Sequence, residues 1–131
     1  MNDTLKVLES RRSCRNFDSE KMVSEEDIQA IIEAGTYAAS GMGRQSSIII
    51  AVTNKELRNQ LSAENAKIMG ADTDPFYGAP VILVVLANKD IPTYKYDGSL
   101  VMGTSSMTSE AFSLTMISMK QIEMIVREDF L

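Results

Sequence analysis

Apolar residues recur along this chain with two spacings, and the spacing separates predicted helices from predicted strands. Helical spacing after a polar cap predicts five helices, over residues 3–11, 25–37, from Asn54 onward, about 97–114 and 117–130. Continuous β-branched apolar runs predict two buried strands, over 48–53 and 81–87. The second strand is apolar on both faces, which is typical of a central strand.

The polar ends and apolar faces of the helices make more specific predictions. Asp3 or Thr4 is expected to cap the first helix, Ser24 the second and Asn54 the third. The hydroxyl-rich segment 104–109 weakens the fourth helix, because its residues are poor helix formers. The expected apolar stripes are Leu5 and Leu8; Ile28, Ile31, Ile32 and Ala34; Leu57 and Leu61; Leu100, Met107, Ala111 and Leu114; and Ile122, Ile125 and Val126.

Loops are predicted where glycine, proline and serine interrupt these patterns. The segment 40–47 holds two glycines and three serines and disfavours continued helix. Shorter turns are expected at 72–75 and 78–80, each of which contains a proline.

Two strands do not make a self-sufficient sheet. Burying one large aliphatic side chain is worth ~1.5–3 kcal/mol, so a half-covered run over 81–86 would forfeit a sizeable part of a domain's ~5–15 kcal/mol stability. Three explanations are open at this point: weak strands that the pattern does not reveal, a sheet completed by another chain, or a longer natural domain.

Composition narrows the class of protein. The 131 residues predict one domain, and 44% hydrophobic with 24% charged residues is typical of a folded globular chain. A net charge of −5 argues against nucleic acid or an anionic membrane as the main partner. There is no apolar run of the roughly 18–20 residues that a membrane span needs, and no basic leader begins the chain. A cytoplasmic location is expected because a single cysteine fits a reducing compartment.

The chemistry-bearing residues are equally restrictive. The chain has no histidine and one cysteine, Cys14, which argues against a zinc or copper site, an internal disulfide and a Ser-His or Cys-His hydrolase. An enzyme with this composition is expected to take its chemistry from a bound cofactor. Cys14 itself is expected to be a small buried residue.

A basic cluster near the N-terminus stands out on this acidic chain. The segment 11–17 carries Arg11, Arg12, Ser13 and Arg15, three guanidinium groups and a hydroxyl within five residues. Arginine offers a fork of donors that matches phosphate. The alternative is a helix end that carries solvated arginines.

Five motifs, taken in order, resemble the flavin-dependent nitroreductase family. They are the basic segment 11–17, the helix start 24–27, the segment 34–45, Asn65 with the later segment 75–80, and the segment 97–102. The resemblance covers roughly residues 5–114. It implies an α+β fold with a central, mainly antiparallel sheet flanked by helices, and an intertwined homodimer whose partner completes the sheet.

The resemblance also implies a function and a cofactor. Family members bind FMN at two interface sites and use NAD(P)H to reduce nitroaromatics, quinones or flavins by hydride transfer through the flavin. The expected partners are a second copy of the chain and a small-molecule electron acceptor. No side chain is expected to act as a catalytic acid or base, and no metal is expected.

The resemblance assigns cofactor contacts to three segments. The basic cluster would hold the phosphate and ribityl oxygens, and the glycine-containing loop would approach the flavin of the partner subunit. Asn65 would bond the pyrimidine edge of the ring and Lys67 its electron-rich end; without the resemblance Asn65 reads as a surface residue, and Asp97 is first a helix cap. The predicted cofactor-binding residues are Arg11, Arg12, Ser13, Arg15, Ala39, Ser40, Gly41, Gly43, Gln45, Asn65 and Lys67.

The sequence departs from the family pattern in three places. The usual Asn-Arg-Gln-Pro-Trp is Gly-Arg-Gln-Ser-Ser over 43–47, the helix after Asp97 is rich in hydroxyls, and family members continue with two more strands and a basic C-terminal element. Residues 1–131 are therefore expected to form a single nitroreductase-like domain without those strands, as a short variant, a truncated chain or the product of a frameshifted gene.

The departures also favour a rival function. This is a degenerate, non-catalytic family member that serves as a flavin-binding, anion-binding or structural dimer module. A small-anion-binding domain unrelated to flavin is a third alternative.

Overall fold

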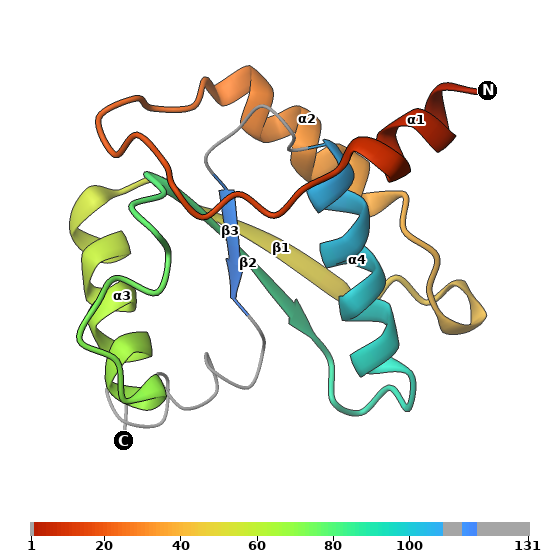
Figure 1. The fold of residues 1–131 in the computed structure, drawn as a ribbon. Helices are drawn as coiled ribbons and strands as arrows, with labels where there is room; N and C mark the ends of the chain where they lie inside the picture. The colour runs from red at the N-terminus through yellow and green to blue at the C-terminus, as the bar shows by residue number, and fades with distance from the viewer. Residues whose placement is uncertain (1, 109–113, 118–131) are drawn as a thin grey trace.

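One mixed sheet organises the computed structural model, which describes residues 2–108 and 114–117 (Figure 1). The strand order is β1–β2–β3, with β1 spanning Ser47–Val52, β2 Val81–Ala87 and β3 Leu114–Ile117. β1 is antiparallel to β2, whereas β3 is parallel to it. Together with the helices, this sheet confirms the predicted α+β class.

β2 is the central strand, as its pattern predicts. The five residues from Val81 to Val85 are each at most 5% exposed. The four-residue strand β3 covers the edge of β2 that β1 leaves open, and it is one of the weak strands that the apolar pattern did not reveal. The fourth predicted helix was therefore wrong at Leu114 and the fifth at Ile117, because pairing with β2 outweighs local helix preference there. The remaining predictions for 109–113 and 118–130 lie outside the described residues.

In the described residues, four α-helices and one 3₁₀ turn accompany the sheet. They are α1 (Asp3–Ser10), α2 (Glu25–Thr36), the turn η1 (Gly41–Gly43), α3 (Lys55–Met69) and α4 (Tyr94–Thr108). Ser24 and Asn54 cap α2 and α3 as predicted, each accepting a hydrogen bond from the N–H three residues on. The cap of α1 is Asn2 and not Asp3 or Thr4, and α4 begins three residues before Asp97.

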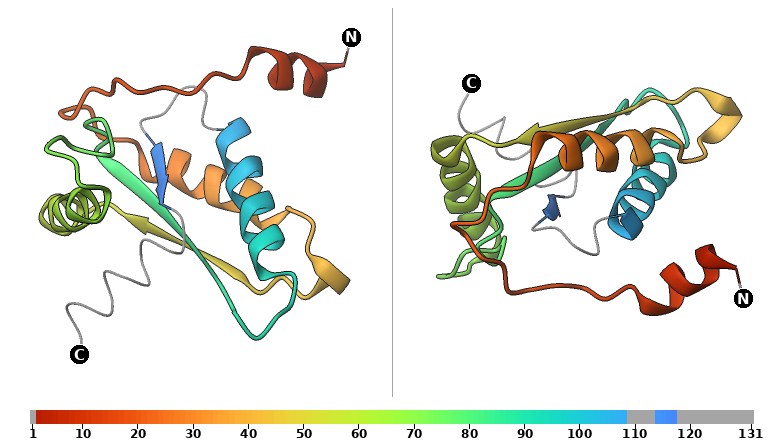
Figure 2. Two further views of the ribbon diagram at one scale, coloured as in Figure 1. Left: turned by 60° about the horizontal axis from the view of Figure 1, so that its bottom comes forward. Right: turned by 90° about the horizontal axis from the view of Figure 1, so that it is seen from above.

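The helices cover the two faces of the sheet unequally. Side chains alternate along β1, so Ile49 lies on the face under α2 and α4, while Ile48, Ile50 and Val52 lie on the face toward α3. Figure 1 and the left view of Figure 2 both show α3 on the opposite side of the sheet from α4.

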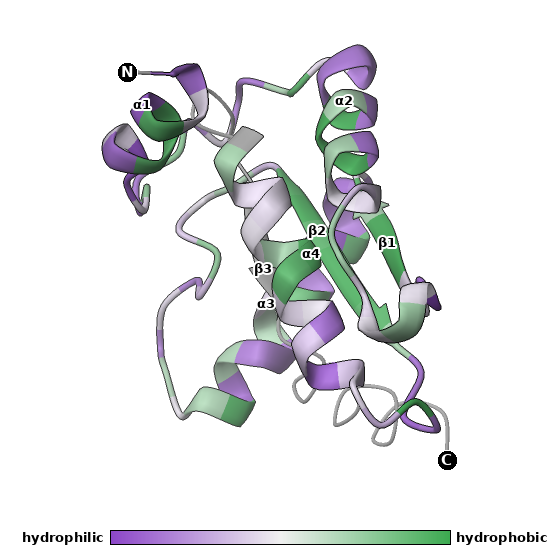
Figure 3. Cartoon of the chain, turned by 90° about the vertical axis from the view of Figure 1, so that its right-hand side faces the viewer, coloured by the Kyte–Doolittle hydropathy of each residue, from purple (hydrophilic) through white to green (hydrophobic). Residues whose placement is uncertain are grey.

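The α3 face is only partly covered. Val52, Ile82 and Val84 form a buried cluster with Phe76, against which Leu61 packs. Ile48 and Ile50 lie beyond this cluster and are 55% and 42% exposed, so β1 is half-buried rather than buried as predicted. In Figure 3, β1 and β2 are nonetheless the most continuously hydrophobic part of the chain.

The predicted apolar stripes of α3 and α4 each include a residue that faces solvent. Leu57 on α3 and Leu100 on α4 are 46% and 48% exposed. The buried stripe of α3 is instead polar and consists of Arg58, Ser62 and Asn65, which follow each other at helical spacing. Apolarity alone therefore misplaces the inner face of this helix.

α1 contributes no buried residue, and both views of Figure 2 show it standing apart from the sheet and its covering helices. Its apolar stripe, Leu5 and Leu8, is about half exposed. No helix among the described residues is long and apolar enough to cross a membrane.

Candidate functional site

The basic cluster lies where α1 ends and an extended segment begins; we call residues 11–23 the N-terminal strap. The N–H of Arg11 caps α1 by donating to the carbonyl of Val7. Nη1 of Arg12 donates to the carbonyl oxygens of Glu9 (2.8 Å) and Arg11 (2.9 Å). A guanidinium at this position satisfies carbonyls that a helix end leaves unpaired. Arg12 therefore caps α1 in this structure.

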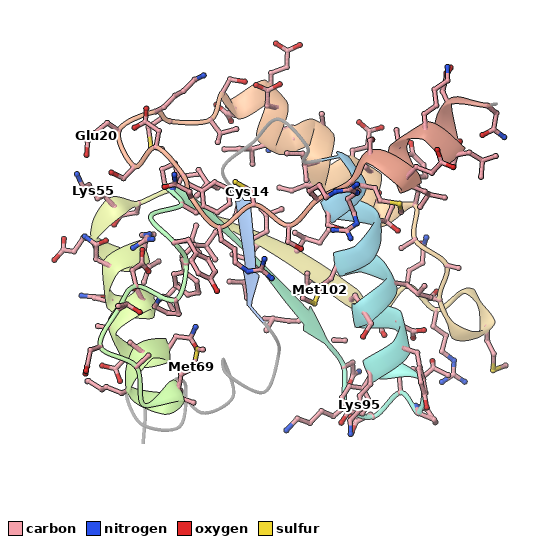
Figure 4. The ribbon with its side chains drawn as sticks, viewed as in Figure 1. Cys14, Glu20, Lys55, Met69, Lys95 and Met102 are labelled. Carbon is pink, nitrogen blue, oxygen red and sulfur yellow. The ribbon has the colours of Figure 1, made fainter. Side chains whose placement is uncertain are left out.

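The rest of the cluster is accessible. Ser13 and Arg15 are exposed and Arg11 is half-buried, and within 2–108 and 114–117 the guanidinium groups of Arg11 and Arg15 form no hydrogen bond or ion pair. Figure 4 shows Cys14 on the same strap. Cys14 is exposed, so the prediction of a buried cysteine is wrong; Figure 2 shows the segment that follows α1 apart from the sheet.

The far end of the strap is fixed by backbone contacts. The N–H of Phe17 donates to the carbonyl of Tyr77 at 3.3 Å. Gly78, with φ +77°, lets the two backbones approach: a Cβ at this position would lie 3.4 Å from the carbonyl oxygen of Phe17. The strap is thus anchored at Phe17 while its basic part remains accessible.

The second predicted segment, residues 39–47, forms a loop that we call the glycine loop. The hydroxyl of Ser40 accepts a hydrogen bond from the N–H of Gln45 (2.9 Å), which closes the loop on itself. Met42, Gly43 and Gln45 have positive φ values of 55°, 65° and 47°. Met42 is 88% exposed, so the tip of the loop projects into solvent.

A cavity of about 510 Å³ adjoins the glycine loop. Ala39, Ser40 and Gln45 line it, which brings three of the predicted cofactor-binding residues together. The buried side chain of Asp97, in the first turn of α4, lines the same cavity. The other walls come from α2, β1 and Val101 of α4.

Asn65 and Lys67 point in different directions from α3. Asn65 is 3% exposed, so the surface reading of this residue is wrong, and its Oδ1 has no hydrogen-bond partner among the described residues. Lys67 has a largely exposed side chain that pairs with Glu64 on its own helix. A buried amide oxygen without a donor costs about 1–3 kcal/mol, which makes Asn65 the more informative of the two.

The cavity brings together only part of the predicted cofactor site. In the described part of the chain, no hydrogen bond or ion pair joins the N-terminal strap to the glycine loop. The cavity beside the loop is lined neither by the strap nor by Asn65 or Lys67.

One polar cluster escaped the sequence prediction. The carboxylate of Asp74 accepts hydrogen bonds from a guanidinium nitrogen of Arg58, from the hydroxyl of Ser62 (2.6 Å) and from the N–H groups of Phe76 (3.0 Å) and Gly78 (2.8 Å). Burial alone would raise the pKa of this carboxyl, but the four hydrogen bonds outweigh it and lower the pKa to about 2. This cluster holds the turn that anchors the strap.

The link between Asp97 and the glycine loop was also missed. Oδ1 of Asp97 accepts a hydrogen bond from the N–H of Gly41 (2.9 Å), and Oδ2 accepts one from the hydroxyl of Thr93 (2.8 Å). A hydroxyl four residues before an acid at a helix start was the only local signal. The described residues contain no group of three or more side chains suited to a metal ion.

A family model described as the Nitroreductase family matches residues 8–125, and the chain belongs to the nitroreductase family.

Solved structures support the same fold. A nitroreductase with bound FMN from Desulfitobacterium hafniense is 35% identical, with a TM-score of 0.74 over 84% of this chain and 65% of that one. A nitroreductase with bound FMN from Bacteroides fragilis has a TM-score of 0.76 at 23% identity, over 85% of this chain and 66% of that one. The similarity to the Bacteroides fragilis protein supports only the fold.

Among curated proteins, an oxygen-insensitive NADPH nitroreductase from Helicobacter acinonychis is 29% identical over 85 residues. The match covers 65% of this chain and 39% of the relative. The chain thus aligns with less than half the length of that relative.

Proposed function

We propose that this chain is an FMN-dependent oxidoreductase that takes electrons from NAD(P)H and reduces nitroaromatics, quinones or flavins. The observation that carries the proposal is the 35% identity to an FMN-bound nitroreductase across 84% of the chain. When bound, FMN accepts a hydride and passes electrons to a second substrate, which is the chemistry that this histidine-free chain lacks.

The predicted site residues carry hydrogen-bonding groups that are chemically suited to FMN. Arg11 and Arg15 offer charged donors that suit a phosphate, and Ser13 adds a hydroxyl. The buried Oδ1 of Asn65 is an acceptor in need of a donor, which the pyrimidine edge of a flavin offers. Arg12 can also donate to the phosphate if its guanidinium releases the carbonyl oxygens that it bonds at the end of α1. Carbonyl and phosphate oxygens both accept hydrogen bonds from a guanidinium.

We further propose that two copies build each site, with the glycine loop of one copy next to the strap of the other. The separation of strap and loop within one chain supports this arrangement. So do the exposed Ile48 and Ile50 on β1, because apolar strand residues at an uncovered face favour a covering partner. The proposed roles of Ala39, Ser40, Gly41, Gly43 and Gln45 depend on this pairing.

Flavin binding by the arginine cluster tests the proposal. Arg11→Ala/Arg12→Ala is expected to weaken FMN affinity by at least about tenfold, because charge-assisted hydrogen bonds to phosphate are lost. Titration of apoprotein with FMN, followed by flavin fluorescence, measures the effect. Lys55→Ala removes a positive charge at the start of α3 (Figure 4), outside the arginine cluster and the glycine loop, and should leave the affinity unchanged.

The rival interpretation, a non-catalytic module, predicts different behaviour of the purified protein. A protein that purifies without yellow colour and takes up no FMN supports a non-catalytic module. A flavoprotein that NADPH bleaches under anaerobic conditions supports the enzyme.

A further inference from the structure

Asp97 is a buried carboxylate without a cation beside it. Its side chain lies in the first turn of α4 and is 3% exposed, and none of the ion pairs in the described residues includes it. A buried charge is unfavourable unless hydrogen bonds and dipoles compensate it. The N-terminal end of α4 supplies part of that compensation, since a helix dipole favours an acid there.

The remaining compensation comes from two donors on different segments. Thr93, just before α4, donates its hydroxyl to Oδ2. Gly41 donates its backbone N–H to Oδ1 across 56 residues of sequence. One carboxylate therefore ties the start of α4 to the first turn of the glycine loop.

Packing at Gly41 reinforces this connection. A Cβ at this position would lie 2.3 Å from Oγ1 and 2.7 Å from Cγ2 of Thr93, so only glycine lets the loop backbone come this close. At Gly43, two residues on, a Cβ would meet nothing within 4 Å. The loop is thus held tightly at its base and is open at its tip.

We propose that Asp97 is a positioning residue that fixes the glycine loop at the edge of the cavity. The inference rests on the proposed function, because the loop matters for catalysis only if it contacts the flavin. Asp97 touches Gly41 and Thr93, and acts on the cofactor site through them. Ser40 and Gln45 line the cavity in the required place because the base of the loop does not move.

Limited digestion with trypsin measures the loop without any need for flavin. Arg44 is exposed in the loop, whereas Arg58 is buried in α3 and becomes cleavable only when the domain unfolds. Asp97→Asn is expected to raise cleavage after Arg44 by about tenfold, while cleavage after Arg58 stays much slower because it still requires global unfolding. Hydrogen exchange of the Gly41 amide should accelerate in the same variant.

Matched variants separate the hydrogen bonds from general damage. Thr93→Val keeps the shape next to Gly41 but removes the hydroxyl, and should raise cleavage after Arg44 by about threefold; Thr93→Ser should restore the wild-type rate. Asp90→Asn neutralises an exposed acid in the preceding segment and should behave as wild type.

The outcomes distinguish this inference from the proposed function. No rise after Arg44 in Asp97→Asn, or cleavage after Arg44 only at the rate of cleavage after Arg58, would overturn the positioning role, because the loop would then be cut only in unfolded protein. If the loop opens in Asp97→Asn and FMN affinity falls by about tenfold, the inference is supported in full. If wild-type protein binds no FMN, the proposed function fails while the digestion still decides whether Asp97 holds the loop. If the loop opens but FMN affinity is unchanged, the role at the cofactor site is overturned.

Discussion

Asp74 and Asp97 are two inward carboxylates that this chain stabilises in different ways. Asp74 has a cationic partner, Arg58, in addition to a hydroxyl and two backbone N–H groups. Asp97 has only a hydroxyl and one backbone N–H, and it is the more buried of the two. The charged pair occurs where a turn anchors the strap, and the unpaired acid occurs beside the cavity.

This difference indicates that the contacts of Asp74 stabilise the fold, whereas those of Asp97 position the glycine loop. The Asp74 cluster joins the buried face of α3 to the turn before β2, so it closes part of the core. Asp97 joins a surface loop to a helix start and is easier to replace without unfolding the domain. Variants that break each cluster in turn should separate these two effects.

The largest expected effect follows removal of Arg58. Arg58→Met should lower the free energy of unfolding by about 3 kcal/mol, because it leaves Asp74 without its cation and the carbonyl of Ala79 without its 2.8 Å donor. Chemical denaturation measures this loss. Gln60→Ala, an exposed change on the same helix, should shift it by no more than about 0.5 kcal/mol. If Arg58→Met lowered the free energy of unfolding no more than Gln60→Ala does, Arg58 would not stabilise the core.

A steric change next to Asp97 comes second. Gly41→Ala should lower the free energy of unfolding by about 2 kcal/mol, because its Cβ would overlap Thr93 and force the loop away from Asp97. Thermal denaturation combined with trypsin cleavage after Arg44 checks both consequences.

Gly103→Ala is the matched control for this change, since a Cβ at that position on α4 meets nothing within 4 Å. It should stabilise α4 by about 0.5–1 kcal/mol and leave the loop closed. Similar behaviour of the two alanine variants would mean that Gly41 is not a point of close approach.

The two clusters also show what could be predicted from the sequence. Ser24 and Asn54 were predicted as caps because a cap bonds an N–H only three residues away. β2 was predicted because seven consecutive apolar residues outweigh any other pattern. The family and the fold followed from motifs that kept their order along the chain.

Long-range contacts set the limit of that prediction. Asp97 reads as a helix cap in the sequence, and its one local signal, the hydroxyl of Thr93, does not indicate its bond to Gly41. The polar stripe of Arg58 and Asn65 was missed because inward positions were chosen by apolarity, which placed Leu57 inside. β3 was missed because four residues carry too little periodicity and owe their conformation to β2.

The smallest predicted effect is the pH dependence that Asp74 adds. Its carboxyl has a pKa lowered from 3.8 to about 2 in the folded chain, so the folded state binds fewer protons than the unfolded state between these values. The stabilisation is complete above about pH 4 and is lost as the pH falls toward about 2. Because the Asp74 side chain is 31% exposed, solvent screening holds the effect to about 1 kcal/mol.

Urea denaturation at a series of pH values should show this loss in the wild type and in the exposed control Asp72→Asn, but not in Asp74→Asn. A pH profile of Asp74→Asn parallel to that of the wild type would show that Asp74 does not carry the acid sensitivity, and would weaken the contrast with Asp97.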